Sequence, residues 1–419
     1  MESKLGWGAF STVWRCKVQD GKQGATAAVK VLKSDAEVRD SGEEEVELLE
    51  AVGRAGGGRW VVRLVESFEV VGPHGHHLCL ALEVLSHNLL DCLPNRGGIH
   101  MDNVKTVVRQ MLEGLNFLHN EAGIIHTDIK PENVLVAEGR RDLSQPLPGL
   151  TVKLGDLGSA CWVNRHFSLT IGTRQYRAPE VLLLAPYGPP VDVWATACLA
   201  FELATDQELL NPTGLEGEGL AEARCSNEEL HLALVVRLLG RLPEQLVREG
   251  QNSRKYYSRA GELHHHPGLA STTSLAARLQ ENHGWHPEPA AAFAAFLKPM
   301  LDTRPLGRAT AHQARDHAFL AAEGDKIKSK KMKSMGQDIT EVAYRKMAWT
   351  DFILGGGAGR AQGDPRRRIP RPGRHGGEPA QGGQGAQGSH PAPRCRGQGL
   401  HQVGGNVQNG FHVTVLKVA

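Results

Sequence analysis

Apolar and polar residues alternate along much of residues 1–86, a pattern that is typical of β-strands. Residues 11–16 and 27–31 have strand-like patterning and are separated by glycine-containing turn material. Residues 78–85 form an apolar run that suits a buried strand. One helix is predicted between these strands, after the acidic residues 43–45, because apolar side chains recur on one face at Val46, Leu48, Leu49 and Val52.

The hydrophobic period changes after residue 100. Apolar residues then follow the three- and four-residue spacing of an amphipathic helix, at Val104, Val107, Met111, Leu115 and Leu118. Residues 191–205, 228–240 and 290–301 are also predicted to be helical. A strand-rich part followed by a helix-rich part predicts an α+β fold with two lobes.

Composition narrows the class of protein. The chain has 419 residues, a length at which two to four domains are expected. Hydrophobic residues make up 40% of it. No apolar run approaches the roughly 18 residues that a membrane helix needs. The seven cysteines are odd in number, scattered and without a C-x-x-C pair, which favours a reducing intracellular compartment over a disulfide framework or a zinc ribbon.

The formal net charge of +2 hides two unlike segments. Residues 325–419 hold 16 lysines and arginines against six acidic residues, a balance of +10, which leaves residues 1–324 with a balance of −8. Residues 355–419 contain 17 glycines and six prolines and few large apolar side chains. Such a segment cannot bury enough surface to offset its chain entropy, so we predict a disordered basic tail.

A glycine-rich segment, L-G-W-G-A-F-S-T-V at residues 5–13, lies between two predicted strands. Glycines let backbone N–H groups approach phosphate oxygens without interference from a Cβ atom, and Val13 suits contact with an adenine ring. Taken alone, this segment is better explained as a glycine-rich β-turn.

Lys30 follows seventeen residues after Val13, inside an apolar strand where it can reach phosphates. An isolated lysine there is usually an edge-strand charge. Glu45, on the predicted helix, is a candidate ion-pair partner, with Glu43 and Glu44 as alternatives. A solvated acidic helix start explains the same three glutamates.

The most specific pattern is I-H-T-D-I-K-P-E-N at residues 125–133, directly after the amphipathic helix. It matches the H-x-D-x-K-x-x-N loop that catalyses phosphoryl transfer. Asp128 suits the acceptance of a proton from an attacking hydroxyl, Lys130 the neutralisation of the transferring phosphate, and Asn133 the binding of a metal ion.

Two further motifs follow in order. Residues 155–158 read G-D-L-G, in which Asp156 fits a metal ligand, and residues 172–180 read G-T-R-Q-Y-R-A-P-E. Asp192, in V-D-V-W, and Arg308, which we expect in a late helix, complete the set. Glu180 and Arg308 are predicted to form a buried ion pair, which is costly unless well matched and is therefore structural.

These motifs, in this order and spacing, resemble those of eukaryotic protein kinases over about residues 4–320. More narrowly, the chain resembles the SR-protein kinases, which phosphorylate serines in Arg/Ser-rich splicing factors. The narrower resemblance rests on the segments 4–14, 124–133, 156–162, 173–177 and 194–205. Trp7 in the glycine-rich loop and Thr127 in the H-x-D triplet are unusual among kinases at large.

The resemblance implies a two-lobed protein kinase fold and an ATP- and Mg²⁺-dependent serine/threonine kinase. We expect the N-lobe at residues 1–86, with a truncated first strand, the C-lobe at 87–322, and the tail at 323–419. Asp128, Lys130 and Thr173 are implied as catalytic, and Asn133 and Asp156 as metal ligands. The implied ATP-binding residues are Leu5, Gly6, Trp7, Gly8, Ala9, Phe10, Ser11, Thr12, Val13, Ala28, Lys30, Glu45, Leu82, Glu83 and Leu85.

The expected partner is an Arg/Ser-rich protein, because an acidic kinase body attracts a cationic substrate. Five glutamates lie where the resembling family has its substrate-docking region: Glu216, Glu218, Glu222, Glu228 and Glu229. A solvated acidic loop explains them equally well. Thr127 replaces an arginine that in many kinases pairs with a phosphorylated activation loop, so we predict activity without that phosphorylation.

The alternative function is a weak or inactive kinase-fold scaffold that binds Arg/Ser-rich proteins, and its motivation is the short first strand. A dual-specificity kinase is disfavoured because the E-H-L-A-M-M-E-R motif is absent. The three histidines at 264–266 fit a solvated loop better than a metal site. The Gly/Arg/Gln-rich context of the arginines at 366–368 lacks aromatic stacking residues, which argues against direct RNA binding. We expect a monomer in the cytoplasm and nucleus, with no membrane segment.

Overall fold

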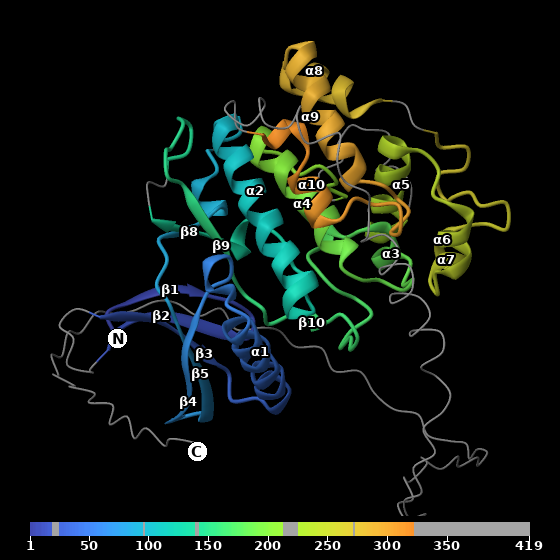
Figure 1. The fold of residues 1–419 in the computed structure, drawn as a ribbon. Coiled ribbons are helices and arrows are strands. Elements are labelled where there is room, and N and C mark those ends of the chain that lie inside the picture. Colours follow the sequence, from blue (N-terminus) through green and yellow to red (C-terminus); the bar gives the residue numbers. More distant parts are fainter. Residues whose placement is uncertain (19–24, 95–96, 139–141, 213–224, 271–272, 322–419) are drawn as a thin grey trace, which may run out of the picture. The chain divides into compact units, whose positions relative to one another are not determined.

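A five-stranded antiparallel sheet forms the N-terminal lobe of the computed structural model, which describes residues 1–18, 25–94, 97–138, 142–212, 225–270 and 273–321 (Figure 1). The predicted tail at 323–419 lies outside the described residues. The strand order is β1-β2-β3-β5-β4. The strands are β1 (Ser3–Trp7), β2 (Ser11–Lys17), β3 (Thr26–Leu32), β4 (Leu64–Gly72) and β5 (Gly75–Leu82).

The register of the central strand β3 brings the expected nucleotide residues together. Lys30 pairs with Val13 of β2 on one side and with Leu80 of β5 on the other. Ala28 of β3 is opposite Leu82 of β5. β5 ends at Leu82, three residues before the apolar run does, because its partner β4 begins opposite that residue.

The predicted N-lobe helix is present as α1 (Ala36–Arg54), but it begins seven residues before the acidic run. The side chain of Asp35 caps it by accepting a hydrogen bond from the Glu37 amide at 3.0 Å, and this cap sets the earlier start. A Cβ atom on Gly42 would lie 2.1 Å from a methyl carbon of Leu32. Glycine therefore lets α1 pack closely on β3. This close packing sets the distance between Glu45 and the sheet.

The C-terminal lobe is mostly helical, and Figure 1 shows its helices grouped apart from β1–β5. Its helices are α2 (Met101–Phe117), α3 (Pro179–Leu182), α4 (Pro190–Thr205), α5 (Asn227–Leu239), α6 (Glu244–Glu249), α7 (Ser253–Tyr256), α8 (Leu275–His283), α9 (Pro287–Met300) and α10 (Ala311–Arg315). Its short strands are β6 (His87–Asn88), β7 (Ile124–Ile125), β8 (Val134–Glu138), β9 (Thr151–Leu154) and β10 (Cys161–Trp162). The helices predicted near residues 191, 228 and 290 correspond to α4, α5 and α9. The α+β, two-lobed fold is therefore confirmed, and the domain boundaries at residues 86 and 322 remain predictions.

Helix α4 is the centre of the C-lobe. Every residue from Val191 to Thr205 is buried, including Trp194 and Phe201, neither of which has any exposed surface. A helix that is hydrophobic all round belongs in a core rather than at a surface. Among the described residues, no helix is both long and apolar enough to cross a membrane.

Arg308 lies in the turn between α9 and α10, so its expected place in a late helix is wrong. Asp302 accepts a hydrogen bond from the Arg304 amide and Pro305 follows, which favours a turn here. The Arg308 guanidinium nevertheless reaches both carboxylate oxygens of Glu180, at 2.7 and 3.0 Å. Both side chains are fully buried, so the pair joins α3 to the turn after α9.

Candidate active site

The glycine-rich turn between β1 and β2 presents an open backbone. The Gly8 amide donates to the Ser11 carbonyl at 2.9 Å and closes the turn. A Cβ atom on Gly6 or Gly8 would meet no atom within 4 Å. Trp7 and Phe10 extend into solvent, with 77% and 65% of their surfaces exposed. The loop therefore leaves free space beside its backbone amides, as phosphate binding requires.

Lys30 lies between two carboxylates. Its ammonium is 2.8 Å from both oxygens of Glu45 and 2.8 Å from Asp156 Oδ1. Burial lowers the pKa of Lys30, but the two carboxylates outweigh burial and raise that pKa above its ordinary value. Lys30 is therefore charged at any physiological pH. Among the three candidate glutamates, Glu45 is its partner.

The other two glutamates of the acidic run pair elsewhere. Glu43 accepts a hydrogen bond from Arg39 at 2.9 Å, one helical turn before it. Glu44 is 3.8 Å from Arg165. Only the spacing of Glu45, on the buried face of α1, turns its carboxylate toward β3.

Gly158 is packed against the three-charge cluster of Lys30, Glu45 and Asp156. A Cβ atom at this position would lie 3.2 Å from Asp156 Oδ1, 3.3 Å from Glu45 Oε2 and 3.5 Å from Lys30 Nζ. The last glycine of the D-L-G motif therefore lets the backbone approach the charges. Leu157 is buried, so it retains an apolar contact in the place of the usual Phe.

Asp128 is the centre of a hydrogen-bonded group in the catalytic loop. Its Oδ1 accepts bonds from the Thr173 amide at 2.9 Å and the Thr173 hydroxyl at 2.7 Å. Its Oδ2 is 2.7 Å from Lys130 Nζ and 3.1 Å from Asn133 Nδ2. Lys130 also donates to the Thr173 hydroxyl at 3.0 Å. These contacts hold four of the predicted residues in one place.

The same contacts keep Asp128 ionised. Burial by itself raises the pKa of Asp128, but the hydrogen bonds from Lys130 and Thr173 outweigh burial and hold that pKa below its ordinary value. The carboxylate is thus negative at neutral pH and can accept a hydrogen bond from a substrate hydroxyl.

Asp192 of α4 holds the backbone of the catalytic loop in place. Its two carboxylate oxygens accept hydrogen bonds from the backbone amides of His126 and Thr127, each at 2.8 Å, and His119 Nε2 lies 2.8 Å away. Thr127 has a φ of 69°, a left-handed conformation that these bonds maintain. Its hydroxyl donates to the Ser159 carbonyl at 2.6 Å, which ties the catalytic loop to the segment after Asp156.

The sequence reasoning gave no role to His126 or Lys153. His126 Nε2 lies 3.0 Å from the Gly155 carbonyl, so it links the catalytic loop to the D-L-G motif. Lys153 donates to the Glu83 carboxylate and the Gly58 carbonyl, both at 2.6 Å. The H-x-D motif already contained the signal for His126. A lysine at an alternate position of a strand carries no comparable signal, because its partner is distant in sequence.

Glu83 and Leu85, two of the implied ATP-binding residues, lie after the end of β5 at Leu82. The Glu83 amide donates to the Arg63 carbonyl at 3.0 Å, and the Glu83 carboxylate accepts from the Arg63 amide at 2.8 Å. The side chain of Glu83 is therefore directed at the start of β4 and at Lys153. Any adenine contact from Glu83 is left to its backbone carbonyl.

The predicted docking glutamates divide into two groups. Glu216, Glu218 and Glu222 lie outside the described residues. Glu228 is half-buried in the first turn of α5. Glu229 is buried and accepts bonds from the His265 amide at 2.9 Å and its ring at 2.7 Å. Glu229 thus holds a loop onto α5 and cannot present its carboxylate to a substrate, which corrects its assignment as a docking residue.

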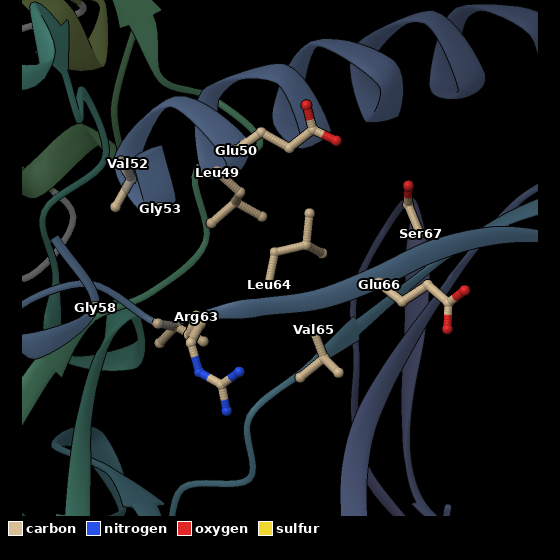
Figure 2. A pocket seen from close by; sticks show the side chains of 11 residues that line it. Leu49, Glu50, Val52, Gly53, Gly58, Arg63, Leu64, Val65, Glu66 and Ser67 are labelled. Carbon is tan, nitrogen blue, oxygen red and sulfur yellow. The ribbon is translucent and has the colours of Figure 1, made fainter. Parts of the chain in front are cut away.

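A separate cavity of about 400 Å³ lies between α1 and β4 (Figure 2). Leu49 and Val52 of α1 and Leu64 of β4 form its apolar wall, while Glu50 and Arg63 are at its edge. None of the residues predicted for catalysis or metal binding lines this cavity. Among the described residues, no three His, Cys, Asp or Glu side chains are grouped as a metal cluster.

Comparison with known proteins identifies the fold and its chemistry. The family model described as "Protein kinase domain" matches residues 1–320. The chain belongs to the protein kinase family. It is 36% identical to "Serine/threonine-protein kinase SRPK" of Physarum polycephalum, over 76% of this chain and 84% of that protein. It is 29% identical to mouse "SRSF protein kinase 3", over 76% and 85% of the two chains.

The similarity extends to a fungal protein, "Protein kinase dsk1" of Schizosaccharomyces pombe, which is 27% identical over 78% of this chain and 81% of its own length. These relatives confirm the resemblance drawn from the motifs. The protein is a serine/threonine protein kinase, and ATP is the phosphoryl donor that this family uses.

Substitution of Thr173 by valine tests the Asp128 group. Valine removes the hydroxyl that donates to Asp128, so kcat is expected to fall by about tenfold to a hundredfold. This factor corresponds to the free energy that a hydrogen bond to a charged group contributes. Because this hydrogen bond lowers the pKa of Asp128, its loss raises that pKa, and the acid limb of the kcat–pH profile should move to higher pH.

The matched control is Thr173→Ser, which keeps the hydroxyl. It should retain most of the activity and the wild-type acid limb. Equal kcat–pH profiles for the valine, serine and wild-type proteins would show that the hydroxyl does not act on Asp128.

Proposed function

We propose that this kinase transfers the γ-phosphate of Mg²⁺-bound ATP to serines in Arg/Ser-rich proteins such as splicing factors. The observations that carry the phosphoryl transfer are the hydrogen-bonded group of Asp128, Lys130 and Thr173 and the charge cluster of Lys30, Glu45 and Asp156. The substrate class follows from the similarity to proteins named SRPK and SRSF protein kinase. The balance of −8 over residues 1–324 supports it, because an acidic body attracts a cationic substrate. Such substrates imply action in the cytoplasm and nucleus.

The described residues fit a magnesium ion held together with ATP. Asn133 uses its side-chain N–H to bond Asp128, at the carbonyl and the carboxylate, which leaves its amide oxygen as a ligand. The Asp156 side chain is about half exposed, and the Asp156 backbone has a φ of 57°. Mg²⁺ prefers such oxygen ligands and takes few of them from the protein, with water and phosphate completing its shell. When bound, the ion neutralises charge on the phosphates of ATP.

The side chains of the site then have separate roles in the reaction. Lys30, oriented by Glu45, holds the phosphates of ATP beneath the glycine-rich turn. Asp128 accepts the hydrogen bond of the serine hydroxyl and takes its proton as the phosphoryl group is transferred. Lys130 is bonded to both Asp128 and Thr173, so its charge is already aimed at the transferring phosphate before substrate arrives.

Incorporation of radiolabelled phosphate from ATP into an Arg/Ser peptide tests this function. The wild-type protein should label the peptide on serine, and the peptide with lysine in place of arginine should be a poorer substrate. Asp128→Asn has the same shape but cannot take the proton, so its rate should fall by about a hundredfold or more. Wild-type labelling no greater than that of Asp128→Asn would instead support a scaffold that binds without turnover.

Thr127 gives a second prediction about activity. Its hydroxyl is bonded to the Ser159 carbonyl, so a neutral contact joins the catalytic loop to the segment after Asp156. A phosphate in the activation loop has no arginine at this position to pair with. Protein treated with a phosphatase and checked by mass spectrometry should therefore keep its full kcat. Loss of activity that returns on rephosphorylation would contradict this.

Glu228 and the three acidic residues at 216, 218 and 222 are proposed to dock the substrate. Their combined change to glutamine should raise KM for an Arg/Ser peptide by about threefold to tenfold, because a single ion pair that is open to water contributes little. KM for ATP and kcat should not change. Glu229 is left intact because it is buried. An unchanged peptide KM at low salt would show that these residues do not bind substrate.

A further inference from the structure

Ser41 of α1 lies beside the active site, but none of the catalytic steps uses it. It is exposed, and it precedes Glu45 by one helical turn, so the two residues share a face of the helix. Its hydroxyl contacts the carbonyl oxygen of Gly158 at 3.4 Å. A single hydroxyl therefore bridges α1 to the segment that follows Asp156.

This bridge is next to the charge cluster that binds ATP. Gly158 is the residue whose added Cβ would come within 3.5 Å of Lys30, Glu45 and Asp156. A movement of Gly158 away from α1 consequently alters the surroundings of all three charges. Ser41 is placed where a small chemical change acts on the Lys30–Glu45 pair without touching substrate.

The space around Ser41 accommodates an added group. A cavity of about 240 Å³ lies between α1 and the segment after Asp156, and Ser41, Glu44, Glu45, Gly158 and Ser159 are among the residues that line it. Glu44 and Glu45 are three and four residues after Ser41, and the Ser41 hydroxyl contacts the Gly158 carbonyl oxygen. The cavity has room for a phosphate, and the part of its wall beside Ser41 carries these two carboxylates and this carbonyl oxygen.

Two cations already pair with these carboxylates: Lys30 with Glu45, at 2.8 Å, and Arg165 with Glu44, at 3.8 Å. Lys30 is also held by Asp156, and the side chains of Arg165 and Glu44 are substantially exposed. An exposed pair of this kind contributes at most about 1 kcal/mol. Attraction between Arg165 and a phosphate on Ser41 would therefore compete poorly with repulsion from the two carboxylates and the Gly158 carbonyl.

The sequence around Ser41 is D-S-G-E-E-E at residues 40–45. Carboxylates stand at one position before the serine and at two, three and four positions after it. A protein kinase with a basic substrate groove is complementary to such a segment. Ser41 itself is exposed on α1, which gives such an enzyme access to its hydroxyl.

We propose that Ser41 is a phosphorylation site for an acid-directed protein kinase and that its phosphorylation lowers the activity of this protein. The γ-phosphoryl group of ATP forms a P–O bond with Ser41 Oγ, ADP leaves, and the hydroxyl proton is released. The resulting dianion repels Glu44, Glu45 and the Gly158 carbonyl. Helix α1 separates from residues 157–160, and Glu45 loses its alignment on Lys30.

The modification itself is tested by incubating the full-length Asp128→Asn protein with casein kinase II and ATP. Its own transfer activity is removed, so any phosphate comes from the added enzyme. Peptide mass spectrometry should find phosphate on Ser41, and a Ser41→Ala version should lack it. Absence of phosphate on Ser41 under conditions that phosphorylate casein would overturn the assignment.

The consequence is tested by comparing Ser41→Glu with Ser41→Gln, which have the same size and differ in charge. Ser41→Gln and Ser41→Ala should stay near the wild-type kcat/KM, and Ser41→Glu should be lower by about threefold to tenfold, the effect of one or two added repulsions. Ser41→Glu should also bind Mg²⁺-ATP more weakly in calorimetry. That binding measurement needs no substrate, so it separates failure here from failure of the proposed function. Equal values for the two variants, or a more active Ser41→Glu through pairing with Arg165, would reject the proposal.

Discussion

The buried carboxylate of Asp192 is the constraint on which the site depends. A carboxylate with no exposure inside the apolar helix α4 costs several kcal/mol unless its oxygens are satisfied. The donors that satisfy it are the amides of His126 and Thr127 and the ring of His119. Because these donors belong to the catalytic loop and to the end of the helix before it, the most buried element of the C-lobe determines where Asp128 lies.

The two sides of the site are held in different ways. On the C-lobe side, Asp128, Lys130 and Thr173 are joined by short hydrogen bonds over a buried core. On the N-lobe side, Lys30 depends on α1, whose contact with the segment after Asp156 includes the single hydroxyl of Ser41. The attraction between Lys30 and its two carboxylates is strong only while the three groups keep their positions. The N-lobe side is thus the part that a change of charge can disturb.

Prediction from the sequence succeeded where the signal was local. The periodicity of apolar residues predicted α2, and the motif spacing around Asp128 predicted which catalytic side chains lie together. Both signals come from residues that are close in sequence and therefore close in the folded chain. The prediction missed two local signals, the cap at Asp35 and the turn at Asp302 and Pro305, so α1 begins earlier than expected and Arg308 lies in a turn. It also failed where a distant residue decided the outcome, since His265 holds Glu229 in the interior.

The fold class, the family and the chemistry could be inferred from the amino-acid sequence, because each catalytic side chain belongs to a motif of fixed spacing. Which of three adjacent glutamates meets Lys30 depends on the folded chain, since a shift of one residue on a helix rotates a side chain by about 100°. The tertiary structure also shows that Asp192 supports the catalytic loop and that Ser41 touches Gly158. Those contacts join residues far apart in the chain, and no local pattern records them.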